Sequence, residues 1–317
     1  MNIFLRAILF LFILSCSQTI ELGGNKHKVG QEPENIFWIQ VPGFSVEHLA
    51  LLKFTDWDPS KGEVLDSFSC LGNFWDYTLF EMRPNLSHSL NSQISGTSFD
   101  ALNCQSFSSD PFYQKNKYLN HTKVFIEQGF DPQDSLLNSS KCKSSSWLTS
   151  LVFINRTQNN MSVDRLKFHA NNTKKVTPGV YDDQSCSKGN CFNSLQENHI
   201  SLMKRYLKNN ILIVYRNLDY SKYLNTGNYK AAHETLVNIE RYINFIKKTY
   251  DPSNTLILLT GGGTINLDFP LRGKKWGDLN NSIKTDKRGV VSPILSFGAS
   301  SELFCGVYEF QNIHTNL

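Results

Sequence analysis

The sequence predicts an α/β fold in which a mainly parallel sheet is flanked by helices, with long surface insertions. Short apolar runs bounded by turn residues recur along the chain, at 36–41, 211–215 and 255–259, and such runs are typical of buried parallel strands. Between the last two runs, residues 229–250 have the periodicity of a long amphipathic helix. Strands that alternate with helices favour a parallel sheet covered on both faces.

The first third of the chain contains clear turn and cap signals. We expect, in order, a strand at 36–41, a helix from Ser45 to about residue 53, a strand at 67–72 and a helix at 87–95. Ser45 suits an N-cap because its hydroxyl can accept a hydrogen bond from an N–H group of the first turn. Gly96 suits a C-cap because glycine adopts the left-handed conformation without steric strain.

Two long polar segments follow. Residues 99–146 and 155–190 are rich in polar residues and lack a clear period, so we interpret both as insertions on the surface of one domain. The first insertion would be held by Cys104 and Cys142. The apolar run at 147–154 between them predicts another buried strand.

The second half alternates helices and strands. We expect a helix at 194–209, a strand at 211–215, a helix at 229–250, a strand at 255–259 and a last strand at 291–297. The helix at 229–250 would bury one face, which consists of Ala232, Leu236, Ile239, Ile243 and Ile246. Pro293 predicts that the last strand is an edge strand or contains a bulge, because proline has no N–H to donate to a ladder.

Length, composition and charge limit the number of domains and the kinds of partner that we expect. The chain has 317 residues, of which 40% are hydrophobic and 19% charged, with a formal net charge of +4. That length can bury a sizeable core, and we expect residues 35–317 to form a single domain without internal repeats. Lysine and arginine are scattered and form no basic stripe, so we expect no nucleic-acid partner.

The first sixteen residues are predicted to be a targeting segment. Arg6 precedes a short apolar stretch that ends in a small residue before Cys16, which is typical of a secretory signal. The ending Ile-Leu-Ser-Cys resembles a bacterial lipobox, although that family prefers leucine where this chain has Ile13. The resemblance implies that Cys16 is acylated and becomes the mature N-terminus, with residues 17–34 as a tether. The alternatives are an ordinary cleaved signal or a membrane anchor. We therefore expect an exported, membrane-anchored lipoprotein, periplasmic or at the cell surface.

The other cysteines suggest disulfides. With Cys16 set aside, six of the seven cysteines remain, and an even number in an exported chain favours disulfide bonds. They are Cys70, Cys104, Cys142, Cys186, Cys191 and Cys305. Six cysteines allow 15 pairings, and the sequence does not choose among them, although Cys186 and Cys191 could close a small loop. A zinc site is the weaker alternative because the chain has no CxxC pair.

An ordered set of segments resembles the alkaline phosphatase superfamily, which includes phosphatases, sulfatases and nucleotide pyrophosphatases. The segments are IFWIQVPGFSVEHLA at 36–50, PNLSHSLNSQISG at 84–96, YRNLDYSKY at 215–223, NTLILLTGGG at 254–263 and SPILSFG at 292–298. Together they cover about half of the chain in the order that the family has. The resemblance implies an alkaline phosphatase-like sheet.

The family's chemistry depends on two metal ions, usually zinc, held by side chains at the strand ends. In this sequence the first aspartate position falls on Pro42, and the Asp-His pair after the central strand falls on Gly262 and Gly263. The histidine that the family has four residues after Asp219 falls on Tyr223. Asp219 is thus the one position that keeps a ligand, and one carboxylate cannot hold two divalent ions.

The family's nucleophile would fall near residue 86 or on Ser87, counted back from Gly96. Our leading hypothesis is a non-catalytic binding or scaffold protein at the cell envelope, with no cofactor, acting on an unknown envelope ligand or protein. The first alternative is a divergent hydrolase of phosphate or sulfate esters that uses Ser87, Asp219 and one zinc or calcium ion. The second alternative is a purely structural envelope protein.

The other candidate groups in the sequence are more simply interpreted as turn, surface or packing residues than as functional sites. The glycine run at 261–263 lacks the Lys-Ser or Lys-Thr of a phosphate-binding loop. The cluster of Arg272, Lys274, Lys275 and Trp276 and the loop carboxylates Asp268, Asp278 and Asp286 are expected to be solvated. Rebuilding of a metal site by those carboxylates is the less favoured alternative. His48 and His233 are expected to be packing or surface residues.

Overall fold

The main feature of the computed structural model is a ten-stranded, mostly parallel sheet. The structure describes residues 32–54, 63–77, 86–97, 111–129, 134–136, 148, 150–156, 166–168, 177–183, 195–205, 210–269 and 283–317. Across the sheet the strands are ordered β12 (Gly306–Glu309), β2 (Cys70–Trp75), β11 (Val291–Gly298), β8 (Thr255–Thr260), β1 (Asn35–Gln40), β7 (Ile211–Asn217), β3 (Thr122–Gln128), β4 (Val152–Arg156), β6 (Gly179–Asp183) and β5 (Leu166–Phe168). Only β11 runs antiparallel to its neighbours in this sheet. The predicted fold class is confirmed.

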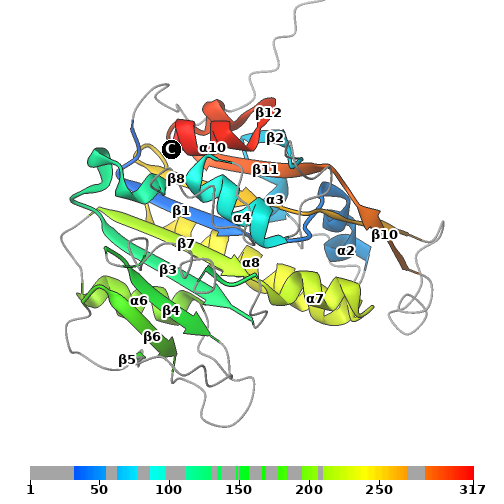
Figure 1. Ribbon diagram of the computed structural model, residues 1–317, viewed down its shortest axis with the longest axis horizontal. Coiled ribbons are helices and arrows are strands. Elements are labelled where there is room, and N and C mark those ends of the chain that lie inside the picture. Colours follow the sequence, from blue (N-terminus) through cyan, green and yellow to red (C-terminus); the bar gives the residue numbers. More distant parts are fainter. Residues whose placement is uncertain are drawn as a thin grey trace, which may run out of the picture.

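Helices cover both faces of the sheet (Figure 1). One face carries η1 (Val46–His48), α2 (Leu49–Phe54), α3 (Glu63–Asp66), α6 (Leu195–Arg205), α7 (Asp219–Asn225) and α8 (Tyr229–Thr249). The other face carries α4 (Leu86–Ser95), η2 (Phe112–Gln114), η3 (Asn116–Tyr118) and α10 (Phe310–Asn316). A separate two-stranded sheet consists of β9 (Ile265–Asp268) and β10 (Lys284–Arg288). The sheet therefore has a hydrophobic core on each side.

The long helix α8 forms as its periodicity predicts. Asn228 caps it by accepting a hydrogen bond from the Ala231 N–H at 3.2 Å. All five residues of the predicted apolar face are buried. Because these residues lie three or four positions apart, they form one stripe that packs on the sheet.

Two expectations about strands were wrong. Strand β3 comes from the range 99–146, which we interpreted as an insertion, yet it lies between β7 and β4 with Val124 and Ile126 buried. Likewise β5 and β6 come from the range 155–190. The polar residues around these short apolar runs hid them, because a run of three to seven residues gives a weak periodic signal.

Strand β11 is internal, so the edge position inferred from Pro293 was also wrong. It pairs with β2 and β8 without a register shift. The Pro293 carbonyl accepts a hydrogen bond from the Gly261 N–H at 2.9 Å, but proline cannot return one. The Gly261 carbonyl accepts instead from the Gln93 Nε2 at 2.9 Å. A side chain of α4 thus replaces the missing ladder bond, and the sheet tolerates the proline.

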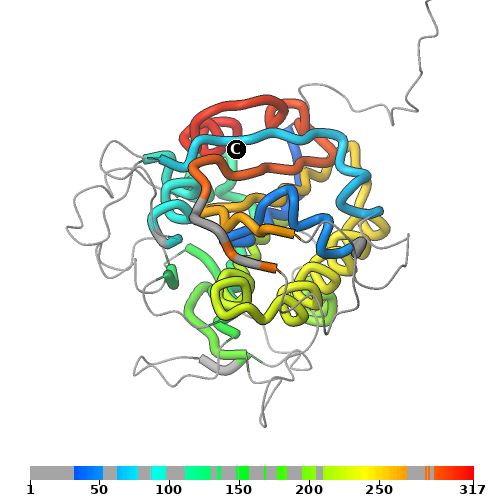
Figure 2. The backbone as a smooth tube through the Cα atoms, turned by 90° about the vertical axis from the view of Figure 1, so that its right-hand side faces the viewer, coloured from blue at the N-terminus to red at the C-terminus, as the bar shows by residue number. Residues whose placement is uncertain are grey.

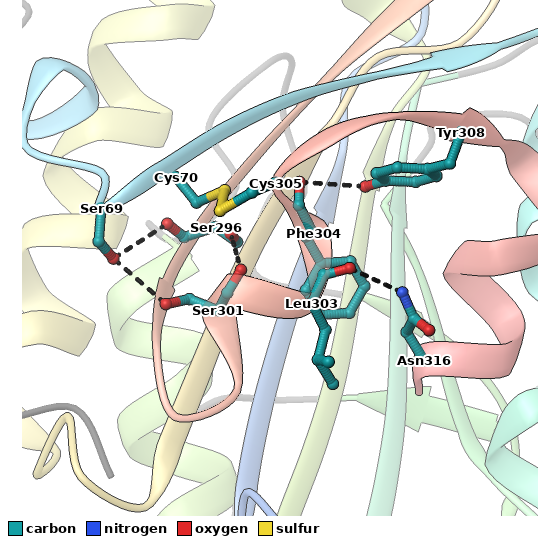
Figure 3. The surroundings of a disulfide bond; sticks show 9 residues. All are labelled: Ser69, Cys70, Ser296, Ser301, Leu303, Phe304, Cys305, Tyr308 and Asn316. Atoms are coloured by element: carbon teal, nitrogen blue, oxygen red, sulfur yellow. Dashed lines mark hydrogen bonds between the residues drawn. A yellow bond between two sulfur atoms is a disulfide. The ribbon is translucent and has the colours of Figure 1, made fainter. Parts of the chain in front are cut away.

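A disulfide between Cys70 and Cys305 joins segments 235 residues apart in sequence. In Figure 2 the light-blue β2 lies beside the red β11 and β12. Cys70 begins β2 and Cys305 directly precedes β12, so the bond joins these two strands at one end. Figure 3 shows that the Ser69 hydroxyl lies next to the bond and contacts the Ser296 carbonyl and the Ser301 hydroxyl. The bond therefore fixes η5 (Ser301–Phe304) and β12 against β2. It confirms that the chain contains a disulfide.

The expectations for the N-terminal segment and for the other cysteines remain predictions. Cys16 with the signal and residues 17–31 of the tether, and Cys104, Cys142, Cys186 and Cys191, lie outside the described residues. In the part of the chain that is described, no helix is both long and apolar enough to cross a membrane.

Candidate functional site at the carboxyl edge of the sheet

The predicted ligand positions follow neighbouring strands at one edge of the sheet. Pro42 follows β1, Gly262 follows β8 and Asp219 follows β7. Gln40 at the end of β1 is in register with Thr260 of β8 and with Arg216 of β7. Because these strands are parallel, their carboxyl ends meet at the edge where open α/β sheets place their sites.

The turns after β1 and β8 close on each other through their backbones. The Gly43 N–H donates to the Gly262 carbonyl at 2.8 Å, and the Ile265 N–H donates to the Gly43 carbonyl at 3.0 Å. Gly43 also lies against Ser221 of α7, where an added Cβ would be 3.3 Å from the serine Cβ. These contacts bury the turns, and the Pro42 and Gly262 positions supply only backbone groups.

Helix α4 packs directly on the glycine run. A Cβ placed on Gly262 would lie 2.8 Å from the Ser89 Oγ and 3.0 Å from the Gln93 Nε2. A Cβ on Gly263 would lie 2.6 Å from the Leu86 Cδ2, and Gly263 has a φ of +55°, which disfavours any other residue. Side chains of α4 therefore occupy the space that an aspartate or histidine at 262 or 263 would need.

Asp76, just after β2, links the glycine run to α4. Its carboxylate accepts hydrogen bonds from the Ser89 hydroxyl, from the Gly263 N–H and from the Ser292 hydroxyl, the last at 2.9 Å. The side chain is buried, and burial raises its pKa to about 6 although the three donors act in the opposite direction. Sequence reasoning missed this residue because its partners are 13 to 216 positions away.

A row of polar side chains lies near the carboxyl ends of six neighbouring strands. Register pairs place side by side, in order, Thr260, Gln40, Arg216, Glu127, Asn155 and Asp182. Paired residues of parallel strands project to the same face, which here is the face that α4 covers. Each of these residues directly follows an apolar residue in the sequence, a signal that could have identified the row.

Gln93 of α4 is the hub of one half of the row. Its Oε1 accepts from the Thr260 hydroxyl at 2.9 Å and from the Gln40 Nε2 at 3.3 Å. The Thr260 hydroxyl accepts in turn from the Trp38 indole N–H at 2.9 Å. All of these side chains are fully buried, so their hydrogen bonds hold α4 on the sheet.

Arg216 is the centre of the other half. Its Nε donates to the Gln40 Oε1 at 3.0 Å and its Nη1 to the Asn91 Oδ1 at 3.4 Å. The Nη1 atom also lies 3.7 Å from the Glu127 Oε2, and the guanidinium lies 5.2 Å from the Phe125 ring centre. Burial lowers the pKa of Arg216 to about 10, opposed mainly by the negative Glu127. The guanidinium therefore remains a cation, held inside the protein and away from solvent.

Asp219 lies at the expected edge and faces a different group of residues. Gly129, with a φ of +94°, allows it to approach the end of β3, where an added Cβ would be 2.6 Å from the Asp219 Oδ1. Burial raises the pKa of Asp219, while Lys222, Gln128 and Arg156 act to lower it. Tyr223, which occupies the predicted position of a histidine ligand, packs partly buried against the core.

The other predicted candidates are dispersed. Ser87 is the second residue of α4, and its side chain is outside what the structure describes, as are the basic cluster at 272–276 and Asp278. Asp268 is exposed on β9. His48 is a buried packing residue: its Nε2 contacts the Ile265 carbonyl at 2.7 Å and its Nδ1 the Tyr220 hydroxyl at 2.9 Å.

The donor set does not fit a pair of zinc ions. The positions that must offer side-chain lone pairs carry proline, tyrosine and two glycines. Within the described ranges, no three side chains of His, Cys, Asp or Glu are grouped so that they could hold a metal ion. The polar groups that are brought together at this edge bond one another instead.

Comparisons with known proteins agree on the fold. No protein-family model matches the sequence, and no curated protein matches it significantly. An alkaline phosphatase from Thermus thermophilus has 10% identity and a TM-score of 0.61, with 92% of each chain covered. The alkaline phosphatase of the Antarctic bacterium TAB5 has 13% identity and a TM-score of 0.58, with 90% of this chain and 97% of that chain covered.

A third similar structure is the C-terminal periplasmic domain of EcEptC from Escherichia coli, solved in complex with zinc. It has 10% identity and a TM-score of 0.50, covering 91% of this chain and 82% of that chain. At these identities the likeness shows the fold alone. The chain therefore has an alkaline phosphatase-like fold, as the ordered segments of the sequence predict.

Proposed function

We propose that this protein is exported and uses an alkaline phosphatase-like fold for a non-catalytic role, binding or scaffolding at the cell envelope. Its partner would be an envelope ligand or protein. An acylated Cys16 would attach it to the membrane on the periplasmic side or at the cell surface. In this proposal the two-ion site of the fold has been lost.

One observation carries the proposal. Ser89, Gln93 and Leu86 of α4 pack within 3.0 Å of where side chains at 262 and 263 would begin. A site for ions and substrate needs open, polar space beside its ligands, and this edge is close-packed. Arg216 adds a buried positive charge on the same face, which opposes the entry of a divalent cation.

The test is metal content together with activity. The purified full chain is dialysed against zinc, magnesium or calcium, its bound metal is measured, and turnover of phosphate monoesters, phosphate diesters and sulfate esters is assayed. We expect less than one ion per chain and no turnover above that of the Ser87→Ala and Asp219→Ala variants. About two ions per chain, with turnover that both variants abolish, would instead establish a hydrolase.

The anchor is tested separately. Cys16→Ser should release the protein from the membrane fraction of its host, because acylation requires the thiol of that cysteine. An unchanged partition, or an N-terminus that begins after residue 16, would refute acylation and leave an ordinary signal.

The alternative of a one-ion hydrolase has one observation in its favour. Asp219 is half-buried at the carboxyl edge, and burial raises its pKa, as is common for functional carboxylates. It predicts that Asp219→Asn abolishes calcium- or zinc-dependent turnover while the far-ultraviolet circular dichroism spectrum is unchanged.

A further inference from the structure

The sequence contains seven Asn-X-Ser or Asn-X-Thr triplets without proline at X, the acceptor pattern for N-glycosylation. They begin at Asn85, Asn120, Asn138, Asn155, Asn160, Asn171 and Asn280. Only Asn120 and Asn155 lie in the part of the chain that the structure describes. These two have opposite environments, so the fold distinguishes between them.

Asn120 is on the surface. It lies in the turn between η3 and β3 and is exposed. The turn is held by its backbone, because the Leu119 N–H donates to the Asn116 carbonyl at 3.2 Å and the His121 N–H to the Tyr118 carbonyl at 3.1 Å. Leu119 beside it is 66% exposed, an apolar side chain that a bulky saccharide would shield from other proteins.

Asn155 is inside. It is 3% exposed within β4, and its Nδ2 donates to the Asp182 Oδ1 at 3.2 Å. A saccharide on this nitrogen would replace that hydrogen bond and would have to enter the close-packed layer between the sheet and its helices. A chain modified at Asn155 therefore cannot adopt this fold.

We propose that Asn120 is an N-glycosylation site and that the folded protein carries no glycan on Asn155. The proposal rests on the export part of the proposed function, because a secretory pathway must supply the donor. That donor is an oligosaccharide carried on a polyprenyl pyrophosphate. The Asn120 Nδ2 forms a bond to the anomeric carbon, the bond from that carbon to the pyrophosphate oxygen breaks, and the pyrophosphate leaves with the electron pair. The amide proton passes to a base of the transferase.

The position of Asn120 also limits where partners can bind. Thr122, the third residue of the triplet, begins β3, while the candidate site lies at the other end of that strand. Seven residues of strand separate the two ends by roughly 20 Å. A glycan on Asn120 would shield the amino edge of the sheet and leave the carboxyl edge open to a ligand.

The test is site-specific mapping of glycans. The full chain is expressed in cultured eukaryotic secretory cells in two versions, one with its own residues 1–16 and one with an unrelated secretion leader in their place. Glycans are removed enzymatically in ¹⁸O-water, which marks each formerly occupied asparagine as labelled aspartate, and peptides from cells and medium are analysed by mass spectrometry.

We expect label on Asn120 and none on Asn155 in the secreted protein. Asn120→Gln and Thr122→Ala should each remove one glycan from the intact mass, and Thr122→Ser should retain it, since a hydroxyl is kept. An unlabelled Asn120 in secreted protein, or a labelled Asn155 in folded protein, overturns the proposal.

The two leaders separate this proposal from the one on export. If only the version with the replaced leader is secreted and its Asn120 is labelled, residues 1–16 do not direct export in these cells and the glycosylation site stands. If both versions are secreted with a bare Asn120, export stands and the glycosylation site is refuted.

Discussion

Two features of Gly263 require glycine, its backbone conformation and its close packing, and the stability that each contributes can be measured separately. Its φ of +55° disfavours other residues, and a Cβ there would lie 2.6 Å from the Leu86 Cδ2. We expect Gly263→Ala to lower the free energy of unfolding by about 2–4 kcal/mol, combining backbone strain with overpacking. Urea denaturation of the purified protein would measure the change.

Gly227 provides the matched control for that prediction. Its φ of +69° is similar, but nothing lies within 4 Å of an added Cβ. Gly227→Ala should therefore cost only the backbone strain, about 1 kcal/mol. Equal losses in the two variants would show that α4 does not press on Gly263.

Buried histidines should make the protein sensitive to acid. Burial lowers the pKa of His48 to about 4, despite its contact with the Ile265 carbonyl, and it lowers the pKa of His199 to about 4. In the unfolded chain both would titrate near 6.5, so the unfolded state binds more protons between these values. Their contribution to stability is complete above about pH 6.5 and is lost as the pH falls toward 4.

Asp76 has the opposite effect on the pH dependence of stability over part of the range between pH 4 and 6.5. Its pKa rises from 3.8 to about 6 on folding, so the folded state binds the extra proton and Asp76 favours the unfolded state as the pH rises through 6. Glu127 and Asp219, whose pKa values burial also raises, act in the same direction as Asp76. The share of each buried histidine is one proton, which corresponds to about 1.4 kcal/mol of unfolding free energy per pH unit between pH 4 and 6.

The check is urea denaturation of the wild type and His48→Gln between pH 4 and 6. Removing His48 removes its proton from the difference between the two states, so the slope of the variant should be smaller than that of the wild type by about 1.4 kcal/mol per pH unit. A slope in His48→Gln equal to that of the wild type would disprove the role assigned to His48.

At the scale of elements, Gln93 determines how α4 docks. It bonds the Thr260 hydroxyl and the Gly261 carbonyl, both buried. Gln93→Leu keeps the approximate shape but leaves both groups without this partner, so we expect a loss of about 2–4 kcal/mol. The exposed Gln311 of α10 is the control, and Gln311→Leu should change stability by less than about 0.5 kcal/mol. Similar small changes in both variants would mean that the polar layer does not hold α4.

Elements were predictable where local pattern and burial agree. The α8 stripe follows from residue spacing alone, and Ser45 caps η1 as its position before an apolar run predicts. Strand β3 was missed because TKVFIEQ is too short to stand out from polar surroundings. Pro293 was misjudged because the bond that compensates for it comes from Gln93, which is 200 residues earlier in the chain.

At the scale of the whole molecule, the order of segments predicted the fold but not the site. Thr260 and Arg216 each follow an apolar run and Gln40 lies near the end of another, yet only the strand order makes them neighbours on one rung. The link from Asp76 to Gly263 spans 187 positions and has no local signal. The sequence showed that positions 42, 262 and 263 carry no ligating side chain, and the packing of α4 shows which side chains lie beside the two glycines.

Placing ligating side chains at 262 and 263 tests whether this edge of the sheet has room for metal ions. In an open site, the double variant Gly262→Asp/Gly263→His would gain zinc affinity, and zinc would raise its melting temperature. Here the new side chains must displace Ser89, Gln93 and Leu86, which costs several kcal/mol. We expect the melting temperature to fall by roughly 5–10 °C and to be unaffected by zinc or chelator, as in the wild type. Gly227→Asp, at a site with open space, should lower it by less than half as much. A zinc-dependent rise in the double variant, measured by differential scanning calorimetry, would show that α4 can move aside and that this edge has space for metal ions.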